Sequence, residues 1–312
     1  MIRLSAITPS GHVQLGNYLG AVRRWAREGT PDDVYFISDL HAMTSSHNPA
    51  KLRTLTREQF AVLIATGVDP HSVCVQSDLV RELGALTWVL ECTCTYGEAA
   101  RMTQFKEKSA KTNSASRSSV RLSLLTYPVL MAADILLQGA GEVPVGEDQL
   151  QHVELARALA RRFNGTYGEV FTVPKAVVPK AGARIKDLAD PARKMAKSAR
   201  DSTGTVFVLD PPDLVRRKIR RAVSSPEGIA NLADVLTACT GKEAEDFTDR
   251  YAELKDVVAD AVIEELRPVR ERTVELLEDQ PELDRIRASG ASRARSRAQH
   301  TLDAALRLSG LT

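Results

Sequence analysis

Short apolar segments alternate with helix-like segments over the first 75 residues, and no other feature of the sequence constrains the fold as strongly. Residues 2–7, Val34–Ile37 and Val73–Val75 are apolar runs of strand length. Residues 17–29 and 49–67 lie between them and have the apolar spacing of helices that end at glycine. Alternating strands and helices are typical of a parallel sheet covered by helices, so we expect an α/β fold.

The character of the chain changes near residue 210. Before that point, we predict two helices, a loop-rich stretch and a short strand, at residues 124–137, 148–163, 174–197 and 206–209. From residue 214 onward the sequence is almost entirely helix-forming. We therefore predict an α/β domain with an insertion over residues 1–209, followed by an α-helical domain over residues 210–312.

Composition excludes several classes of protein. A hydrophobic fraction of 43% allows a substantial core, which excludes a disordered chain. No apolar run reaches the roughly 20 residues that span a bilayer, and the first residues do not resemble a signal peptide. The cysteines, Cys74, Cys92, Cys94 and Cys239, lack the spacing of a zinc site. We expect buried free thiols in a reducing cytoplasm, no structural metal and no membrane association.

The net charge of +2 conceals an uneven distribution of charge. Basic segments at residues 216–221 and 285–307 flank an acidic stretch at residues 253–282, and their charges cancel in the sum. Each basic segment is either a solvated helix face or a surface that contacts RNA phosphates.

A polar loop, T-P-S-G-H-V-Q-L-G-N-Y at residues 8–18, separates the first predicted strand from the first helix. Glycines at such a turn let a ligand approach the backbone, and free N–H groups at the helix start favour phosphate. We expect Asn17 to cap this helix. The alternative is an ordinary tight turn.

A second motif is basic: R-K-M-A-K-S occupies residues 193–198. Its lysines, Lys194 and Lys197, could converge on a polyphosphate as point charges. The motif is short and common, so a solvated basic loop is the alternative interpretation.

The segment at residues 125–137 places Tyr127, Met131 and Asp134 on one face of a helix. An acid within such an apolar stretch is costly to bury without a donor. It either caps or pairs within the protein, or it receives a ligand N–H group. The acidic helix start at residues 143–152 follows closely and is either an ordinary cap or part of the same site.

Together with R-M-T-Q-F-K-E-K-S at residues 101–109 and G-A-R-I at residues 182–185, these blocks resemble the tryptophanyl-tRNA synthetases, a family of class I aminoacyl-tRNA synthetases. The resemblance covers nearly the whole chain. Tyrosyl-tRNA synthetases share the fold and signatures, but the block at residues 127–137 argues against them. The resemblance implies a Rossmann-like catalytic domain and a helical anticodon-binding domain whose C-terminal helix packs back on the catalytic domain.

The resemblance assigns roles position by position. It implies an ATP site at Thr8, Gly16, Asn17, Gly182, Arg184, Ile185, Lys194, Lys197 and Ser198. It implies catalytic roles for Gln14, Lys108, Lys194 and Lys197. It implies a tryptophan pocket formed by Leu4, Ala6, Tyr127, Met131, Asp134, Ile135, Val143, Asp148 and Gln149. In that pocket Asp134 would accept the indole N–H, and Tyr127 and Gln149 would receive the amino group.

The implied activity is ATP-dependent formation of tryptophanyl-adenylate and transfer of tryptophan to tRNA(Trp), with release of pyrophosphate and AMP. Mg²⁺ is expected to enter with ATP and to need no dedicated protein ligands. A cytoplasmic homodimer is also implied.

The sequence departs from the family pattern at several positions. Gln14 replaces the usual His or Thr, Ala196 replaces Ser, and Thr8 replaces Gln; Leu4 and Ala6 also differ. A stretch that usually follows residue 225 is missing. These changes suggest a divergent or auxiliary form with altered inhibitor sensitivity. The alternative is a catalytically weak paralogue that binds tryptophan or a protein partner without charging tRNA.

Overall fold

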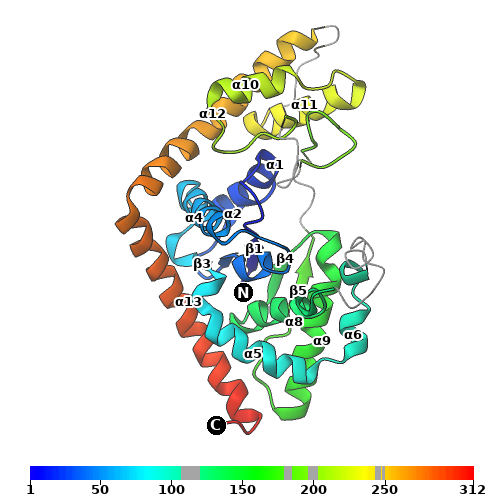
Figure 1. Cartoon of the computed structure of the whole chain (residues 1–312), viewed down its shortest axis with the longest axis vertical. Helices are drawn as coiled ribbons and strands as arrows, with labels where there is room; N and C mark the ends of the chain where they lie inside the picture. Colours follow the sequence, from blue (N-terminus) through cyan, green and yellow to red (C-terminus); the bar gives the residue numbers. More distant parts are fainter. Residues whose placement is uncertain (107–119, 179–184, 196–202, 243–246, 248–249) are drawn as a thin grey trace.

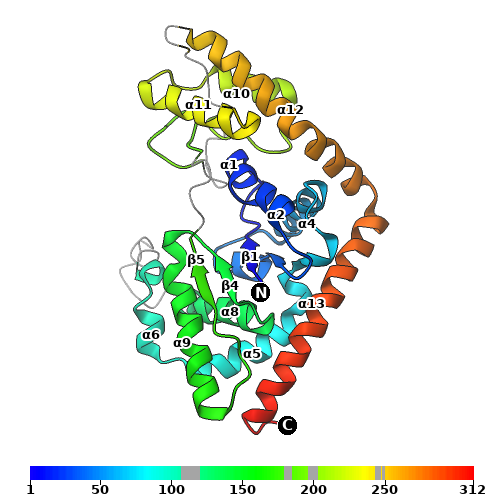
Figure 2. The same ribbon diagram turned by 180° about the vertical axis from the view of Figure 1, so that it is seen from behind.

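A computed structural model describes residues 1–106, 120–178, 185–195, 203–242, 247 and 250–312. The molecule is elongated, with α10 (Pro212–Arg220), α11 (Pro226–Thr240) and the start of α12 (Tyr251–Glu278) at one end (Figures 1 and 2). Helix α13 (Gln280–Leu308) follows α12 and runs along one side of the sheet to the other end of the molecule (Figure 1).

Parallel strands form the centre of the α/β part. They are β1 (Leu4–Ile7), β2 (Val34–Ile37), β3 (Val73–Val75), β4 (Glu142–Pro144) and β5 (Lys175–Val177). β2 pairs with both β1 and β3, in a register that places Leu4 opposite Val34. β4 pairs with β5, and a bridge between Arg3 and Glu142 places β4 beside the start of β1. The carboxyl ends of these strands therefore meet along one edge, where ligands bind in open α/β sheets.

Helices cover the sheet. The helices of the first 100 residues are α1 (Leu15–Asn17), η1 (Tyr18–Val22), α2 (Arg23–Glu28), α3 (Asp39–Ala42), α4 (Pro49–Ala65), η2 (Pro70–Ser72), η3 (Gln76–Leu79), α5 (Val80–Thr93) and α6 (Tyr96–Ala100). Then come α8 (Leu122–Leu137), η5 (Glu147–Gln149) and α9 (Leu150–Tyr167). Asn48 caps α4 by accepting the Lys51 N–H at 3.0 Å, and Pro49 suits its first position. Within the described ranges, no helix combines the length and apolar composition needed to cross a membrane.

Several predictions of local structure were wrong. Residues 206–209 do not form a strand; Phe207 makes only an isolated bridge to Gln14. The stretch at residues 174–197, predicted to be rich in loops, also contains β5, which was not predicted. Gln14, rather than Asn17, caps the first helix. Of the cysteines only Cys74 is fully buried; Cys92 is exposed because it lies at an outward position near the end of α5, and Cys94 and Cys239 are half-buried.

The apolar core extends across residue 210. One cluster joins Ile37 and Val62 of the α/β part to Val215, Val258 and Leu266 of the following helices. Helix α4 packs against α12, and α13 packs against β3, η2, α5 and α8. A division near residue 210 therefore remains a prediction, since the chain on both sides of it shares one continuous core.

Candidate active site

A cavity of about 900 Å³ opens at the carboxyl edge of the sheet. Many of the residues that we predicted for ATP or tryptophan line it: Leu4, Ala6, Thr8, Tyr127, Met131, Asp134, Val143, Asp148, Gln149 and Lys194. They come from β1, α8, β4, η5 and the loop at residues 185–195. The fold thus brings together side chains that are up to 190 residues apart in the sequence.

Other predicted site residues lie elsewhere. Ile135 is completely buried in the core beneath α8, and Ile185 is also buried, so neither belongs to the cavity wall. Gln14, Gly16 and Asn17 lie beside the cavity, in the first turn of α1, without lining it. The predictions for Lys108, Gly182, Arg184, Lys197 and Ser198 fall outside the described residues.

The Asp134 carboxylate is fixed at the floor of the cavity. Gln76 donates its side-chain N–H group to the two carboxylate oxygens of Asp134, at 2.9 Å each. His41 Nε2 lies 3.0 Å from Asp134 Oδ2. The Asp134 side chain is only 6% exposed. A carboxylate held by these donors is oriented to accept a further hydrogen bond from a ligand in the cavity.

Sequence reasoning missed His41 and Gln76. Gln76 is fully buried, and its Oε1 accepts the backbone N–H groups of Leu40 at 3.1 Å and His41 at 3.3 Å. One amide therefore holds both α3 and the Asp134 carboxylate. A signal was present, because Gln76 directly follows β3 and His41 follows β2 closely, at the sheet edge where ligands bind.

A second polar network surrounds Tyr127. Its hydroxyl donates to Gln104 Oε1 at 3.0 Å and lies 2.9 Å from His152 Nε2. Gln149 donates to Asp148 Oδ2 at 2.8 Å beside it. Burial, followed by the charge of Asp148, raises the pKa of Tyr127 to about 12. Tyr127 is therefore a neutral phenol at physiological pH, and the network offers oxygen acceptors to a cationic group.

The Gln14 side chain connects the start of α1 to the basic motif at residues 193–198. Its Oε1 accepts the N–H groups of Gly16 and, at 3.2 Å, Asn17. Its Nε2 donates to the Met195 carbonyl at 2.9 Å, and the residue is only 5% exposed. The neutral amide thus occupies N–H groups that we expected to face phosphate, and it does so while holding the backbone beside Lys194.

Acceptor and cationic groups remain available around this turn. Asn17 Oδ1 is buried and has no hydrogen-bond partner among the described residues. The exposed Lys194 reaches the cavity wall one residue before the buried Met195. Within the described part of the chain, no group of His, Cys, Asp and Glu side chains is arranged to hold a metal ion. The arrangement suits a polar, phosphate-bearing ligand next to an apolar ligand with one buried donor.

Comparison with known proteins agrees with this geometry. Residues 1–273 match the family model described as tRNA synthetases class I (W and Y). The chain is 50% identical to tryptophan–tRNA ligase 1 of Streptomyces coelicolor, over 98% of this chain and 96% of that protein. It is 43% identical to tryptophan–tRNA ligase of Clostridium perfringens, over 96% of this chain and 95% of that protein.

The structure is also similar to a solved one. It matches the crystal structure of tryptophanyl-tRNA synthetase from Campylobacter jejuni, complexed with ADP and tryptophan, with a TM-score of 0.85. That match covers all of both chains at 31% sequence identity.

Proposed function

The chain belongs to the class I tRNA synthetases of the tryptophan and tyrosine group, and on this basis we propose that it activates L-tryptophan with ATP and transfers it to tRNA(Trp). The observation that carries this proposal is the buried Asp134 carboxylate, which faces the cavity and is fixed by Gln76 and His41. Tryptophan is the large planar amino acid whose side chain offers a single N–H donor to such an acceptor.

Selection of tryptophan over phenylalanine follows from the free-energy cost of leaving the Asp134 carboxylate without a hydrogen-bond donor from the ligand. Phenylalanine has no side-chain donor, so its binding would leave part of the Asp134 acceptor capacity unused and desolvated. A site built to hydrogen-bond one substrate group can reject an analogue lacking it by roughly 10⁴-fold. Leu4, Met131 and Val143 supply the apolar wall, and Tyr127 and Gln149 lie at the polar end, where we place the amino group.

Activation is an in-line displacement at the α-phosphorus of ATP. A carboxylate oxygen of tryptophan forms the new P–O bond, the bond to the bridging oxygen of the β-phosphate breaks, and pyrophosphate leaves. Lys194 places a positive charge at the cavity wall to stabilise the leaving pyrophosphate, and the amide of Gln14 holds the adjacent backbone. When bound with ATP, Mg²⁺ would neutralise part of the phosphate charge. The protein mainly contributes position.

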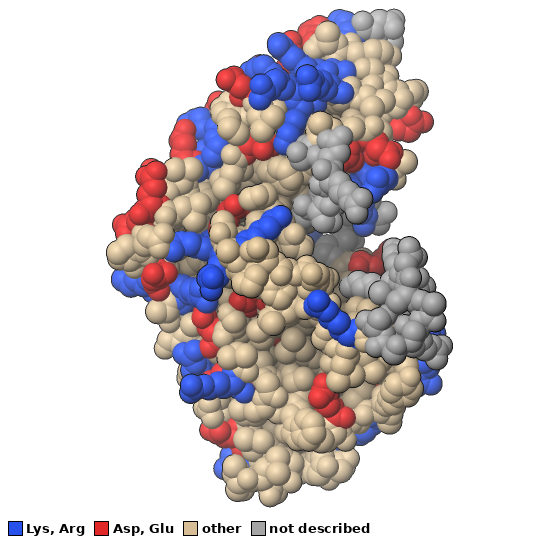
Figure 3. All heavy atoms as spheres, viewed as in Figure 1, with Lys and Arg blue, Asp and Glu red and all other residues tan. Residues whose placement is uncertain are grey.

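Transfer to tRNA completes the reaction. The 2′-hydroxyl of the terminal adenosine attacks the acyl carbon, loses its proton, and displaces AMP. We assign the anticodon arm to the helical part after residue 210, where basic side chains gather on one face over α10 and α12 (Figure 3). Arg216 and Arg220 pair with Asp260 and Asp256 of α12, whereas the exposed Arg217 makes no ion pair with any described residue.

We also propose a cytoplasmic homodimer. Trp88 of α5, Tyr96 of α6 and Leu122 of α8 are 66%, 75% and 73% exposed. Helix α8 packs against both α5 and α6, and we take the exposed apolar side chains of these neighbouring helices as one interaction surface. Exposed apolar patches of this kind mark interaction sites, and a second copy of the chain is the partner that the family assignment supports.

Amino-acid-dependent ATP–pyrophosphate exchange tests the proposal. Exchange should be fastest with tryptophan among the twenty amino acids, and the same protein should charge tRNA(Trp). Exchange with tyrosine instead would move the chain to the tyrosine branch of the family. Folded protein that binds tryptophan but shows no exchange would identify a paralogue that no longer activates its amino acid.

A further inference from the structure

The arginines of α13 differ in their contacts. Arg287 pairs with Asp78 at 2.7 Å, and Arg295 lies 3.5 Å from Glu82, so both fasten α13 to the neighbouring η3 and α5. Arg285 pairs with Glu282 on its own helix at 2.8 Å. Arg293 and Arg297 instead line a surface groove.

This groove lies between η2 and α13 and has a volume of about 880 Å³. Arg293, Arg297 and His300 line it from α13, together with the hydroxyls of Ser292 and Ser296, and His71 lines it from η2. The α13 residues in its wall extend from Ser289 to Thr301, which is about 18 Å along the helix axis at 1.5 Å per residue. The lining thus consists of arginine, histidine and hydroxyl side chains over a length greater than that of one compact anion.

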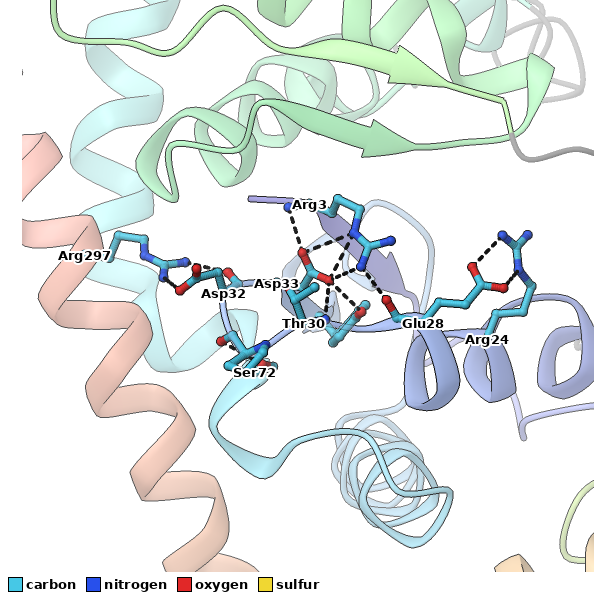
Figure 4. Close-up of polar contacts among 10 residues, drawn as sticks. Arg3, Arg24, Glu28, Thr30, Asp32, Asp33, Ser72 and Arg297 are labelled. Carbon is cyan, nitrogen blue, oxygen red and sulfur yellow. Dashed lines mark hydrogen bonds and ion pairs between the residues drawn. The ribbon is translucent and has the colours of Figure 1, made fainter. Parts of the chain in front are cut away.

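The arginines of the groove are only weakly neutralised. The Asp32 carboxylate, in the loop before β2, lies 3.4 Å from Arg293 and 4.0 Å from Arg297, and this side chain is 71% exposed. Arg297 also donates to the Asp32 main-chain carbonyl at 3.2 Å (Figure 4). Burial, and then the neighbouring charge of Arg293, lowers the pKa of Arg297. The next residue is different, because Asp33 is buried and pairs with Arg3 at 2.6 Å (Figure 4). An external anion could therefore replace Asp32 without disturbing the Asp33 pair.

The groove lies away from the active-site cavity. Asp32 and His71 both precede strands, so the groove is at the amino edge of the parallel sheet, whereas the cavity is at the carboxyl edge. A chain bound in the groove would leave the ATP and tryptophan sites open.

We propose that this groove binds the sugar–phosphate backbone of tRNA, an inference that rests on the proposed function. Arginine forks bind phosphate oxygens, serine hydroxyls donate to them, and contacts of this kind position RNA without reading its sequence. The extended lining fits successive phosphates of a strand, and the exposed Asp32 holds the arginines until RNA replaces it.

Two substitutions that should change the KM for tRNA in opposite directions test the proposal. Arg293→Gln should raise the KM for tRNA about three- to ten-fold and reduce the slope of log affinity against log salt by about one. Asp32→Asn removes the internal competitor and should lower the KM for tRNA. Arg285→Gln is the matched control, since it removes the same charge from the same helix outside the groove, and its KM should be unchanged.

Exchange without tRNA separates failure of this proposal from failure of the proposed function. All three variants should retain wild-type ATP–pyrophosphate exchange with tryptophan. If the wild-type protein charges tRNA but Arg293→Gln and Asp32→Asn leave its KM and salt dependence unchanged, the groove is not an RNA site. Tripolyphosphate that binds the groove in direct titration, without competing with tRNA, would also overturn the proposal.

Discussion

Asp134 shows how a single residue can determine amino-acid selection. Asp134→Asn keeps the shape but places an amide N–H₂ among the donors of Gln76, His41 and the indole. We expect kcat/KM for tryptophan to fall about 10- to 100-fold, because hydrogen bonds to charged groups contribute about 1.5–3 kcal/mol. Exchange assays with tryptophan and phenylalanine measure the effect. An unchanged preference for tryptophan would show that Asp134 does not receive the indole.

Gln14 is the departure from the family pattern with the clearest structural consequence. Gln14→Glu keeps an acceptor for the Gly16 and Asn17 N–H groups but loses the donor to the buried Met195 carbonyl. We expect the KM for ATP to rise about 10-fold, since an unsatisfied buried acceptor costs about 1–3 kcal/mol, while the KM for tryptophan changes little. Steady-state exchange at varied ATP measures this split.

Gln14→His serves as the control because imidazole keeps an N–H donor. Its KM for ATP should lie closer to that of the wild-type enzyme. The same pair of proteins tests whether Gln14 alters the response to an indole-based inhibitor. Equal inhibition of wild type and Gln14→His would remove Gln14 as the cause.

The limits of sequence reasoning are clear at these residues. A helical period of 3.6 was enough to place Tyr127, Met131 and Asp134 on one face, and all three line the cavity. Gln76 and His41 follow predicted strands, but the helical period does not show that their side chains meet Asp134, which lies on a helix far along the chain. The amide of Gln14 was also unpredictable, since its partner at Met195 is 181 residues away.

At the scale of elements, we expect the contact between α6 and α9 to make the free energy of unfolding depend on pH. Arg162 of α9 binds Glu98 at 2.6 Å, and Glu98 also closes the capping box with Thr95. Hydrogen bonds from Arg162, and then those from the Thr95 backbone and hydroxyl, lower the pKa of Glu98 from 4.5 to about 2. A lowered carboxyl pKa means that this stabilisation is complete above about pH 4.5 and is lost as the pH falls towards 2.

Arg162→Gln should therefore be destabilising at neutral pH, by about 1 kcal/mol or less because Arg162 lies at the surface, where solvent screens the pair. The difference from wild type should shrink when the pH is lowered from 6 to 3. Urea unfolding at both pH values measures it. A constant difference would mean that Arg162 acts through packing rather than through the charge of Glu98.

Replacement of a helical glycine by alanine ordinarily stabilises a protein, but at Gly290 we expect the opposite effect. A Cβ atom at this position of α13 would lie 2.1 Å from the Val73 carbonyl oxygen and 2.9 Å from that of Pro70. Gly290→Ala should destabilise the protein by about 1–3 kcal/mol, because α13 must move away from β3. Gly165→Ala in α9 is the control; its Cβ meets nothing within 4 Å, so it should stabilise by up to about 1 kcal/mol. Thermal unfolding of both variants measures whether each substitution stabilises or destabilises the protein.

The same packing predicts the effect of a C-terminal truncation. Ala291, Ala294, Ala298 and Leu302, which follow residue 289, are buried in the core of the α/β part. Removal of α13 from residue 289 should therefore expose that core and reduce adenylate formation together with tRNA charging. Point variants in the groove separate the two reactions better than truncation does.

At the scale of the whole molecule, the α/β class followed from the alternation of apolar runs and helices, and the strands at residues 34–37 and 73–75 were confirmed. β5 was missed because three residues give no measurable period and they lie among prolines and glycine. The apolar core that joins α4 to α12 was also missed, since sequence position alone suggested a boundary near residue 210. Pattern therefore predicts elements, whereas the association of distant elements depends on three-dimensional packing.

The exposed apolar surface predicts the assembly state. Trp88→Glu places a charge where Trp88, Tyr96 and Leu122 would be covered by a second copy, and it should convert the dimer to monomer. Burial of an unpaired charge is unfavourable, whereas the monomer fold should tolerate a residue that is 66% exposed. Sedimentation velocity at several protein concentrations measures the shift, and unchanged urea unfolding of the protomer is the control.

Cys92 provides an independent probe of the same surface. It is exposed in the protomer and lies one helical turn after Trp88 on α5. A dimer formed through this surface should cover it, so alkylation of wild-type Cys92 should slow as protein concentration rises, while Trp88→Glu should react at a constant rate. A dimer whose Cys92 reacts as fast as that of the monomeric variant would place the interface elsewhere.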